Sequence, residues 1–249
     1  MADPAGRPAP HEMTISAKDI RLMPIASRDA NPLIQRLHYS GTYTRNAQLH
    51  LGAFIGDQCH GVMSFGPPMD KSKVLPLVRE TPWSGMLELA RMAFDDVLPK
   101  NAESRCLAMA RRLIFAHYPQ IEWLLSYSDG TQSGHGTIYQ AAGFDLTQIR
   151  PNRTIYEFPT IGRRYAAMTL EAHWSGETVR QLCADLGVPH EYRTRTTWCK
   201  MGLARPLPGY QLRYMTFRDQ AVRDRLTVPI LPNSAIDDAG ARMVRGEAK

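Results

Sequence analysis

A strand–helix–strand pattern in the middle of the chain most constrains its fold. Met86 to Phe94 form an apolar run with a single charged pair, and Ile121 to Tyr127 form a second apolar run. Between them, after Pro99, apolar residues recur with helical spacing as far as His117, at Cys106, Met109, Ala110, Leu113 and Ile114. This order predicts two strands joined by a helix.

Weaker patterns extend this unit in both directions. Residues 1–12 lack periodicity and predict a disordered leader. The other predicted elements are a strand from Thr14 to Ala26, a helix from Ser27 toward Leu37, a hairpin of Leu51–Ile55 and Cys59–Phe65, a polar helical stretch near Asp70–Val78, a helix at Gly136–Ala142, and a strand from Phe144 to Phe158. Strands that alternate with helices in this way predict an α/β sheet with helices packed against it.

Beyond Tyr165 the patterns are less decisive. Glu177 to Leu186 predict a helix, Tyr210 to Phe217 a strand, and Gln220 to Arg225 a short helix. The last strand of the sheet is either Ile155–Phe158 or Tyr210–Phe217. We expect a leader at 1–12, a catalytic core at 13–170, and a C-terminal extension at 171–249 that packs on the core.

Composition excludes several classes of protein. The chain has 249 residues, of which 43% are hydrophobic and 22% charged, so it is long enough to bury a core and unlike a disordered chain. No apolar run approaches the roughly 20 residues that span a bilayer, and no signal peptide is visible, which predicts a cytoplasmic protein without membrane contact. Four scattered cysteines lack the spacing of a zinc site.

The positive charge is confined to the C-terminal part of the sequence. Residues 1–149 carry 14 basic and 14 acidic residues, whereas residues 150–249 carry 16 and 10. Residues 193–225 concentrate this excess and predict contact with a polyanion. The alternative is an ordinary solvated face. The basic side chains of this segment are Arg193, Arg195, Lys200, Arg205, Arg213, Arg218, Arg223 and Arg225.

Common catalytic motifs are missing from the sequence. It contains no phosphate-binding loop of nucleotide hydrolases, no esterase elbow, no His-Glu-x-x-His zinc motif and no dinucleotide-binding glycine motif. The acidic-Pro-Pro-aromatic loop of adenine methyltransferases is also absent, and Gly66-Pro67-Pro68-Met69 is the nearest approach. Hydrolases of nucleotides and esters, zinc proteases, common dehydrogenases and adenine methyltransferases are therefore disfavoured.

Polar residues at element boundaries are the candidates for chemistry. His38 closes the first helix, Arg91 interrupts an apolar strand, and Asp129 ends a buried strand. Each has an ordinary structural alternative, namely a helix C-cap for His38 and turn formation for Asp129. Arg91 is harder to explain in this way, because a guanidinium in a central strand is costly unless it meets a carboxylate or phosphate.

The start of the helix after Pro99 is a candidate anion site. A strand that ends near Asp96 and a turn through Pro99-Lys100-Asn101 expose backbone N–H groups at a helix N-terminus, where a pyrophosphate fits. The alternative is ordinary capping by Asn101 or Ser104.

These residues resemble a known superfamily and, within it, a particular family. The unit 86–117, the strand 121–128 and residues 136–144 resemble the core of GNAT-type acyltransferases. Several separated blocks are similar to the Mom family of phage DNA-modification proteins over roughly residues 30–245. The blocks are His38–Tyr43, Phe65–Pro68, Glu88–Asp96, Asn101–Arg105 and Ser128–Thr131.

The resemblance implies a fold, a reaction and a set of residues. The fold is a mixed, mostly antiparallel sheet flanked by helices, and the reaction converts adenine in DNA to N6-(methylcarbamoyl)adenine, which protects the DNA from restriction nucleases. The implied catalytic residues are His38, Tyr39, Arg91, Asp129 and Tyr139, the last as general acid on a leaving thiolate. The implied contacts to an acetyl-CoA or other acyl donor are Lys100, Asn101, Ala102, Glu103, Ser104 and Arg105. Residues 99–105 lack the glycines of the usual superfamily loop, so the backbone is expected to approach a pyrophosphate less closely.

The chemistry of adenine agrees with this implication. The exocyclic N6 is a poor nucleophile, so a base such as Asp129 or His38 and a donor such as Tyr139 or Tyr39 are needed. Double-stranded DNA is the expected partner, and a flipped base would stack on Tyr39, Tyr43 or Trp83. The expected DNA contacts are Tyr43, Arg193, Arg195, Lys200 and Arg213.

Several alternatives stay open at this point. One alternative is a conventional GNAT-fold acetyltransferase that acts on a small amine or a protein. Another is a catalytically silent DNA-binding protein. Iron is a further candidate cofactor, with His38, His50, His60 and Asp129 as conceivable ligands, although no spacing marks a metal site. A homodimer is a candidate assembly.

Overall fold

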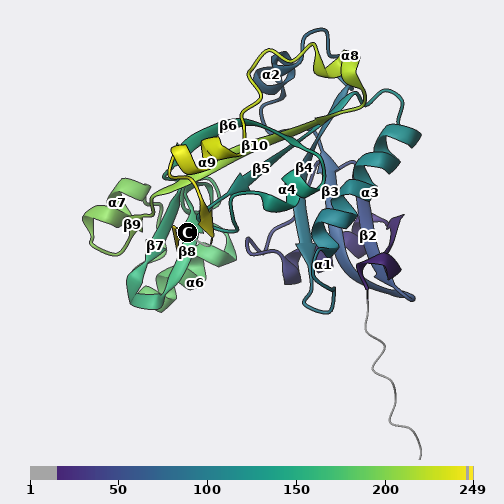
Figure 1. Ribbon diagram of the computed structural model, residues 1–249. Coiled ribbons are helices and arrows are strands. Elements are labelled where there is room, and N and C mark those ends of the chain that lie inside the picture. The colour runs from purple at the N-terminus through teal and green to yellow at the C-terminus, as the bar shows by residue number, and fades with distance from the viewer. Residues whose placement is uncertain (1–15, 245–246, 249) are drawn as a thin grey trace, which may run out of the picture.

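A twisted seven-stranded sheet forms the centre of the computed structural model, which describes residues 16–244 and 247–248 (Figure 1). The strand order is β1-β2-β3-β4-β5-β10-β6. The strands are β1 (Arg21–Pro24), β2 (Leu49–Ile55), β3 (Gln58–Gly66), β4 (Met86–Phe94), β5 (Trp123–Asp129), β6 (Asp145–Asn152) and β10 (Gly209–Phe217).

The pairing of β4 with β5 is parallel, and every other pairing in this sheet is antiparallel. A parallel pair needs a crossover connection, which helix α3 (Ala102–His117) supplies. The predicted α/β fold with a mixed, mostly antiparallel sheet flanked by helices is thereby confirmed. The predicted strand 86–94 and helix 177–186 match the observed elements residue for residue.

The two faces of the sheet are covered differently. Helix α3 and the short helix α4 (Thr137–Ala141) lie in front of the sheet in Figure 1 and bury the largest apolar cluster, which includes Leu89, Cys106 and Leu124. On the opposite face, helix α1 (Ser27–Leu37) packs on β2, β3 and β4 through a smaller cluster. We call this second side the α1 face.

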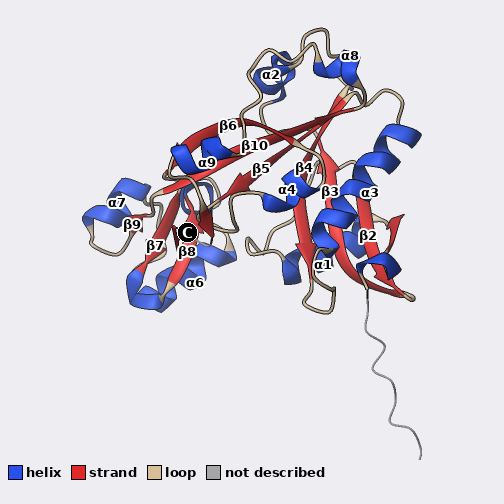
Figure 2. Ribbon diagram, viewed as in Figure 1, coloured by secondary structure: helices blue, strands red, loops and turns tan. Residues whose placement is uncertain are grey.

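Residues 153–208 form a smaller unit inserted between β6 and β10, at the lower left of Figure 2. A three-stranded sheet in the order β8-β7-β9 and three helices enclose a separate apolar cluster centred on Phe158 and Trp198. The elements are β7 (Ile155–Phe158), β8 (Arg163–Ala166), α5 (Ala167–Glu171), α6 (Glu177–Leu186), α7 (Arg195–Lys200) and β9 (Arg205–Pro206).

The remaining elements are short. They are the 3-10 turns Ala17–Asp19, Leu75–Leu77 and Pro159–Ile161, the helices α2 (Lys71–Val74), α8 (Gln220–Arg223) and α9 (Ser234–Asp238), and the two-stranded sheet of β11 (Met243–Val244) with β12 (Glu247–Ala248).

Three expectations about the elements need correction or completion. The strand expected from Thr14 is limited to β1, preceded by a 3-10 turn, and the leader 1–12 lies outside the described residues. The strand expected from Phe144 to Phe158 is two strands in different sheets. The side chain of Asn152 causes the break, because its Oδ1 accepts hydrogen bonds from the N–H and hydroxyl of Thr154 at 3.1 and 2.7 Å.

The inserted unit also decides which strand completes the sheet. Residues 209–217 pair with both β5 and β6, whereas residues 155–158 belong to the small sheet. The expected boundary between a core at 13–170 and an extension at 171–249 falls inside helix α5, and β10 lies in the sheet of the core. The division into domains itself stays a prediction.

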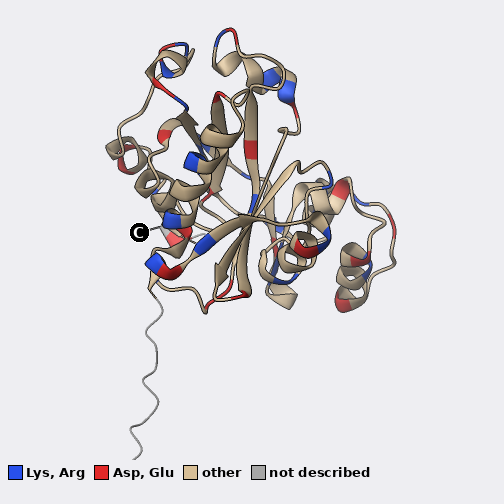
Figure 3. Ribbon diagram, turned by 90° about the vertical axis from the view of Figure 1, so that its right-hand side faces the viewer, with Lys and Arg blue, Asp and Glu red and all other residues tan. Residues whose placement is uncertain are grey.

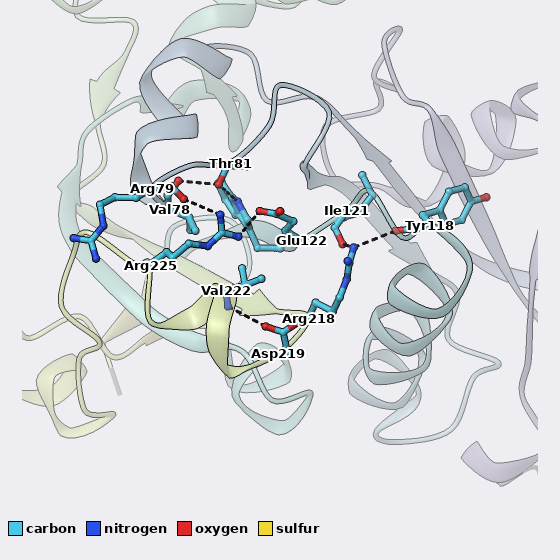
Figure 4. Close-up of polar contacts among 11 residues, drawn as sticks. Val78, Arg79, Thr81, Tyr118, Ile121, Glu122, Arg218, Asp219, Val222 and Arg225 are labelled. Carbon is cyan, nitrogen blue, oxygen red and sulfur yellow. Dashed lines mark hydrogen bonds and ion pairs between the residues drawn. The ribbon is translucent and has the colours of Figure 1, made fainter.

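Two arginines after β10 bind residues at one end of the central strands rather than facing solvent freely (Figure 4). Arg225 pairs with Glu122 at 2.5 Å and donates to the carbonyl of Arg79 at 3.1 Å. Arg218 donates to the carbonyl oxygens of Ile121 and Tyr118. These bonds tie the segment after β10 to the residues that precede β4 and β5.

None of the described helices has the length and apolar character needed to cross a membrane.

Candidate active site

A bulge in β4 positions two charged side chains of the site. Ala90 has no partner on β3, because the register shifts between the pairs that flank it. One extra residue reverses the alternation of side chains along a strand, so Glu88 and Arg91 lie on the same face although they are three positions apart. Leu89, before the bulge, faces the main core, while Ala93, after it, packs under α1 on the other side.

Beside this bulge, β4 and β5 separate. The parallel pairing covers only Met86–Glu88 and Trp123–Leu125, and β5 then continues to Asp129 paired with β10. The separation opens the middle of the sheet between Arg91 and Asp129. Polar groups at such an opening can reach a bound molecule without a neighbouring strand in the way.

Arg91 is satisfied by backbone oxygens. Its Nε donates to the carbonyl of Thr42 at 2.9 Å and its Nη1 to the carbonyl of Ala90 at 2.6 Å. The first bond fastens the loop after α1 to β4, across 49 residues of sequence. The cost of a guanidinium in a strand is thus offset by carbonyls, and its charge remains available to the groups around it.

His38 is held as a neutral imidazole. Burial and the nearby charge of Arg91 lower the pKa of His38 to about 4. Its Nδ1 accepts a hydrogen bond from the backbone N–H of Ser40 at 3.1 Å, so the neutral ring carries its proton on Nε2. The free ring nitrogen is therefore a hydrogen-bond donor, which favours Asp129 over His38 as the base.

The ring of Tyr39 contacts that of His38 in a tilted arrangement, with ring centroids 4.2 Å apart, and the residue is 63% exposed. The surrounding protein and the charge of Asp129 raise the pKa of the Tyr39 phenol, while Arg91 acts in the opposite direction. An exposed ring that also interacts with both charged groups of the opening is suited to contact a planar ligand.

Asp129 is anchored by its own turn and by β6. Its Oδ1 accepts from the N–H of Thr131 at 2.9 Å and from the Thr131 hydroxyl, and its Oδ2 accepts from Nδ2 of Asn152 at 3.0 Å. The turn expected from Asp129-Gly130 is therefore present. Burial nevertheless raises the pKa of Asp129, although these hydrogen bonds counteract it. The Asn152 bond leaves one lone pair of Oδ2 for a substrate proton.

Tyr139 lies on the other side of β5, in α4. Its hydroxyl accepts from Oγ of Ser126 at 2.9 Å, and its ring stacks on Tyr214 at 5.1 Å. Burial raises the pKa of Tyr139 to about 12, so the phenol keeps its proton at neutral pH. A protonated phenol can supply a proton to a leaving group.

The structure thus brings most of the predicted catalytic residues together. The charges of Arg91 and Asp129 both act on Tyr39, Arg91 acts on His38, and Tyr39 acts on Tyr139. Their catalytic roles stay a prediction.

Sequence reasoning missed Glu88 and Asn152. Burial raises the pKa of Glu88 to about 7, and Arg91 counteracts this rise. The charged pair in the apolar strand was the visible signal. Without the bulge, however, a spacing of three places Glu88 and Arg91 on opposite faces, so their shared face could not be inferred.

The predicted donor-binding residues line a cavity of about 450 Å³ between the end of β4 and the starts of α3 and α4. Five of the six predicted residues line it, namely Lys100, Asn101, Ala102, Glu103 and Ser104, whereas Arg105 does not.

The start of α3 is open toward this cavity. The side chain of Asn101 makes no capping bond, and Oγ of Ser104 donates to the carbonyl of Asn101 at 3.2 Å, so neither performs the capping considered above. Asn101 adopts a left-handed conformation with φ of 70°, which glycine and asparagine tolerate best. One asparagine thus takes the conformation that the missing glycines would favour.

The predicted DNA contacts are dispersed, and two of them are buried. Arg193 is 5% exposed and bonds to Glu191 and to the carbonyl of Pro189 at 2.8 Å each. Arg213 is 7% exposed and donates to Thr147. The expectation that these two side chains form part of a free surface is therefore wrong, because their donors are used inside the protein.

The rest of the basic segment is also largely engaged. Arg195, Arg205 and Arg223 form ion pairs with Glu171, Glu157 and Asp145 respectively. Lys200 has no ion pair among the described residues, and Tyr43 packs beside the α1 cluster. Figure 3 accordingly shows basic residues interspersed with acidic ones rather than gathered on one half.

The candidate iron ligands do not converge. His50 lies between Ser64 at 2.7 Å and Ser27 at 3.1 Å, and His60 bonds to Asp95 at 2.9 Å. Among the residues that the structure describes, no group of three His, Cys, Asp or Glu side chains could hold a metal ion. The residues present therefore do not fit the iron considered above, and no step is assigned to it.

The fold and the site together define an α/β protein with a polar site where its parallel strands part. Among solved structures, the chain resembles an IAA acetyltransferase from Bacillus cereus, at 14% identity and a TM-score of 0.41, over 80% of this chain and 99% of the other. It also resembles a Bacillus subtilis acetyltransferase in complex with CoA, at 12% identity and a TM-score of 0.42, over 80% and 97%.

Sequence comparison is more specific. The model of the Mom protein family matches residues 19–235, so the chain belongs to the Mom family. A curated relative, the methylcarbamoylase Mom of Escherichia phage Mu, is 35% identical over 156 residues. That match covers 63% of this chain and 64% of the relative, so it spans slightly less than two thirds of the phage Mu protein.

Proposed function

We propose that this protein is a DNA-modifying enzyme that converts adenine in duplex DNA to N6-(methylcarbamoyl)adenine and thereby shields the DNA from restriction nucleases. One observation carries the proposal. In a chain of the Mom family, the separated segments that contain His38–Tyr39, Arg91 and Asp129 meet at the opening between β4 and β5. The phage Mu relative, a methylcarbamoylase, supports it.

The proposed acyl transfer assigns one role to each group. The N6 lone pair attacks the acyl carbon while Asp129 Oδ2 takes a proton from N6, which compensates for the weak nucleophilicity of an aromatic amine. The bond between the acyl carbon and its leaving group breaks, and the Tyr139 phenol protonates a departing thiolate. Arg91 and the Nε2–H of His38 stabilise negative charge that develops on the acyl oxygen.

The proposed donor is an activated acyl group carried by a CoA-type cofactor. The cavity at the start of α3 supports this assignment, because uncapped backbone N–H groups at a helix N-terminus attract phosphate. When bound, such a donor supplies the electrophilic acyl carbon. A methylcarbamoyl group, CH3–NH–CO–, contains a nitrogen that an acetyl group lacks, so direct transfer to N6 requires a donor whose thioester carries CH3–NH–CO–, whereas acetyl-CoA itself would give N6-acetyladenine.

The proposed acceptor is a base turned out of the duplex. N6 of adenine lies within the stacked duplex, so an enzyme reaches it by flipping the nucleotide into its site. The exposed ring of Tyr39 lies beside Asp129 and offers a stacking surface.

Mass spectrometry of nucleosides tests the proposal. Plasmid DNA is isolated from cells that express the chain or its Asp129→Asn variant, with equal amounts of soluble protein. We expect a deoxyadenosine heavier by one methylcarbamoyl group only with the unchanged chain. Unmodified adenine with the unchanged chain contradicts the proposal. It then favours an acetyltransferase of small amines or proteins, or a silent DNA-binding protein.

A further inference from the structure

The α1 face of the sheet carries a row of polar side chains beside Asp129. Gln211 of β10 pairs directly with Asp129 on one side and with Arg150 of β6 on the other. Directly paired residues in antiparallel strands project to the same face, so these three side chains form one row. Two strand spacings separate its ends, which places the Cα of Arg150 about 10 Å from that of Asp129.

A second row runs next to the first. Arg213 pairs with Tyr127 on one side and with Gln148 on the other. The opposite face of the same strands is apolar, as Leu212 and Tyr214 belong to the main core. Helix α1 covers β2, β3 and β4, so the polar rows lie beyond the part of this face that it protects.

Two guanidinium groups on these rows lack a counter-ion. Burial lowers the pKa of Arg213, and the nearby charge of Arg150 lowers it further, so the two cations act on one another. Arg213 bonds only to Thr147, and Arg150 is exposed. Neither forms an ion pair among the described residues. Arg213 differs in this from most other arginines of the segment 193–225, which are ion-paired.

Neighbouring like charges without a carboxylate repel each other, and an anion between them removes the repulsion. Three carboxyl groups on this face, those of Asp129, Glu88 and Asp145, do not fill that role, and Asp145 is paired with Arg223. Asp129 is held by Thr131 and Asn152, and Glu88 interacts with Arg91 and Tyr127. The row therefore offers charge complementarity to a ligand with phosphate groups.

We propose that Arg150, which lies beside Gln211 and has the positive charge of the buried Arg213 behind it, binds a backbone phosphate of the DNA strand whose adenine enters the site. This inference rests on the proposed function and names the surface that the function needs. A flipped nucleotide leaves its phosphates at the rim of the pocket, and Arg150 lies at that distance from Asp129 on the same face. It moves the DNA contact from the largely ion-paired side chains of the segment 193–225 to Arg150 of β6.

The test measures DNA binding as a function of salt. The full chain and the variants Arg150→Gln and Arg150→Lys are titrated into a fluorescein-labelled duplex with one mismatched adenine, at a series of potassium chloride concentrations. Arg112→Gln is the matched control, because Arg112 is an exposed arginine whose Nε donates to a carbonyl of its own helix α3. Arg150 is exposed as well, so its replacement leaves the fold intact.

We expect Arg150→Gln to weaken binding and to reduce the slope of log K against log salt by about one, the value for one lost phosphate contact. Arg150→Lys should keep the slope, and Arg112→Gln should match the unchanged chain. The KM for an acyl donor should not change in Arg150→Gln, because the donor cavity lies at α3.

Three results overturn the inference. They are an unchanged slope in Arg150→Gln, an equal loss in Arg112→Gln, and a raised donor KM with unaltered DNA binding, which would assign Arg150 to the donor instead. Failure of the proposed function is recognised separately, because it leaves the nucleosides unmodified with the unchanged chain. Modified DNA together with an unchanged slope rejects the role of Arg150 alone.

Discussion

Replacing Asn152 tests whether Asp129 is the base. The amide of Asn152 donates to Oδ2 of Asp129 at 3.0 Å and so favours the ionised carboxylate. A hydrogen bond to a charged group contributes about 1.5–3 kcal/mol, and about 1.4 kcal/mol corresponds to a tenfold change in proton affinity. Asn152→Ala should therefore move the acidic limb of the modification rate upward by about one pH unit or more.

A second variant allows the predicted shifts of the acidic limb to be ranked. Asn152→Asp replaces the donor with a second carboxylate, so it should move the limb further than Asn152→Ala. The assay is the initial rate of adenine modification over a range of pH, with nucleosides quantified by mass spectrometry. The variant Asn46→Ala is the control, since Asn46 is exposed and its side-chain bond goes to Pro67. An identical acidic limb in all four proteins would refute Asp129 as the titrating base.

The pH dependence of the unfolding free energy provides an independent check. The pKa of Asp129 is raised in the folded protein, so its ionisation costs stability as pH rises through its ordinary range toward the raised value. Asn152→Ala enlarges this cost, and the extra loss of unfolding free energy should be greater at pH 7 than at pH 3. Denaturation by urea at the two pH values measures it. A loss that does not depend on pH would mean that only the Thr154 contacts of Asn152 matter.

Three further predictions concern the surroundings of the site. Glu88→Gln should be more stable than the unchanged chain at pH 8 by up to about 3 kcal/mol and similar at pH 4, because ionising a carboxyl with a pKa of about 7 costs stability; equal urea stability at pH 8 would contradict this. Gly209→Ala places a Cβ 2.1 Å from Cγ2 of Thr131 and should lower the free energy of unfolding by about 1–3 kcal/mol. Adding Thr131→Ser removes that methyl group and should restore most of the lost stability, as measured by thermal unfolding. Arg193→Ala should lower the free energy of unfolding by about 3 kcal/mol, because Glu191 and Trp198 lose a buried partner, whereas Lys200→Ala should change it by no more than about 0.5 kcal/mol. Similar urea midpoints for the two variants would contradict the buried role of Arg193.

Local sequence determined the elements whose signals lie within a few residues. The helix spacing before His117 and the apolar run 86–94 predicted α3 and β4 closely, because burial of one helix face or of a whole strand leaves a periodic pattern. The break after β6 was missed, because it depends on the side chain of Asn152 bonding to Thr154 rather than on an apolar pattern. The resemblance of separated blocks supplied the family and most of the candidate site.

Contacts between distant segments decided the rest. The charge excess of residues 193–225 is visible in the sequence, but its acidic partners lie as far away as Glu122, so only folding shows that the excess is largely neutralised. The shared face of Glu88 and Arg91 follows from a bulge, which reverses the alternation that sequence reasoning assumes. The row from Asp129 to Arg150 depends on strand register, and register is set by the whole sheet because one residue of slip moves every side chain to the other face.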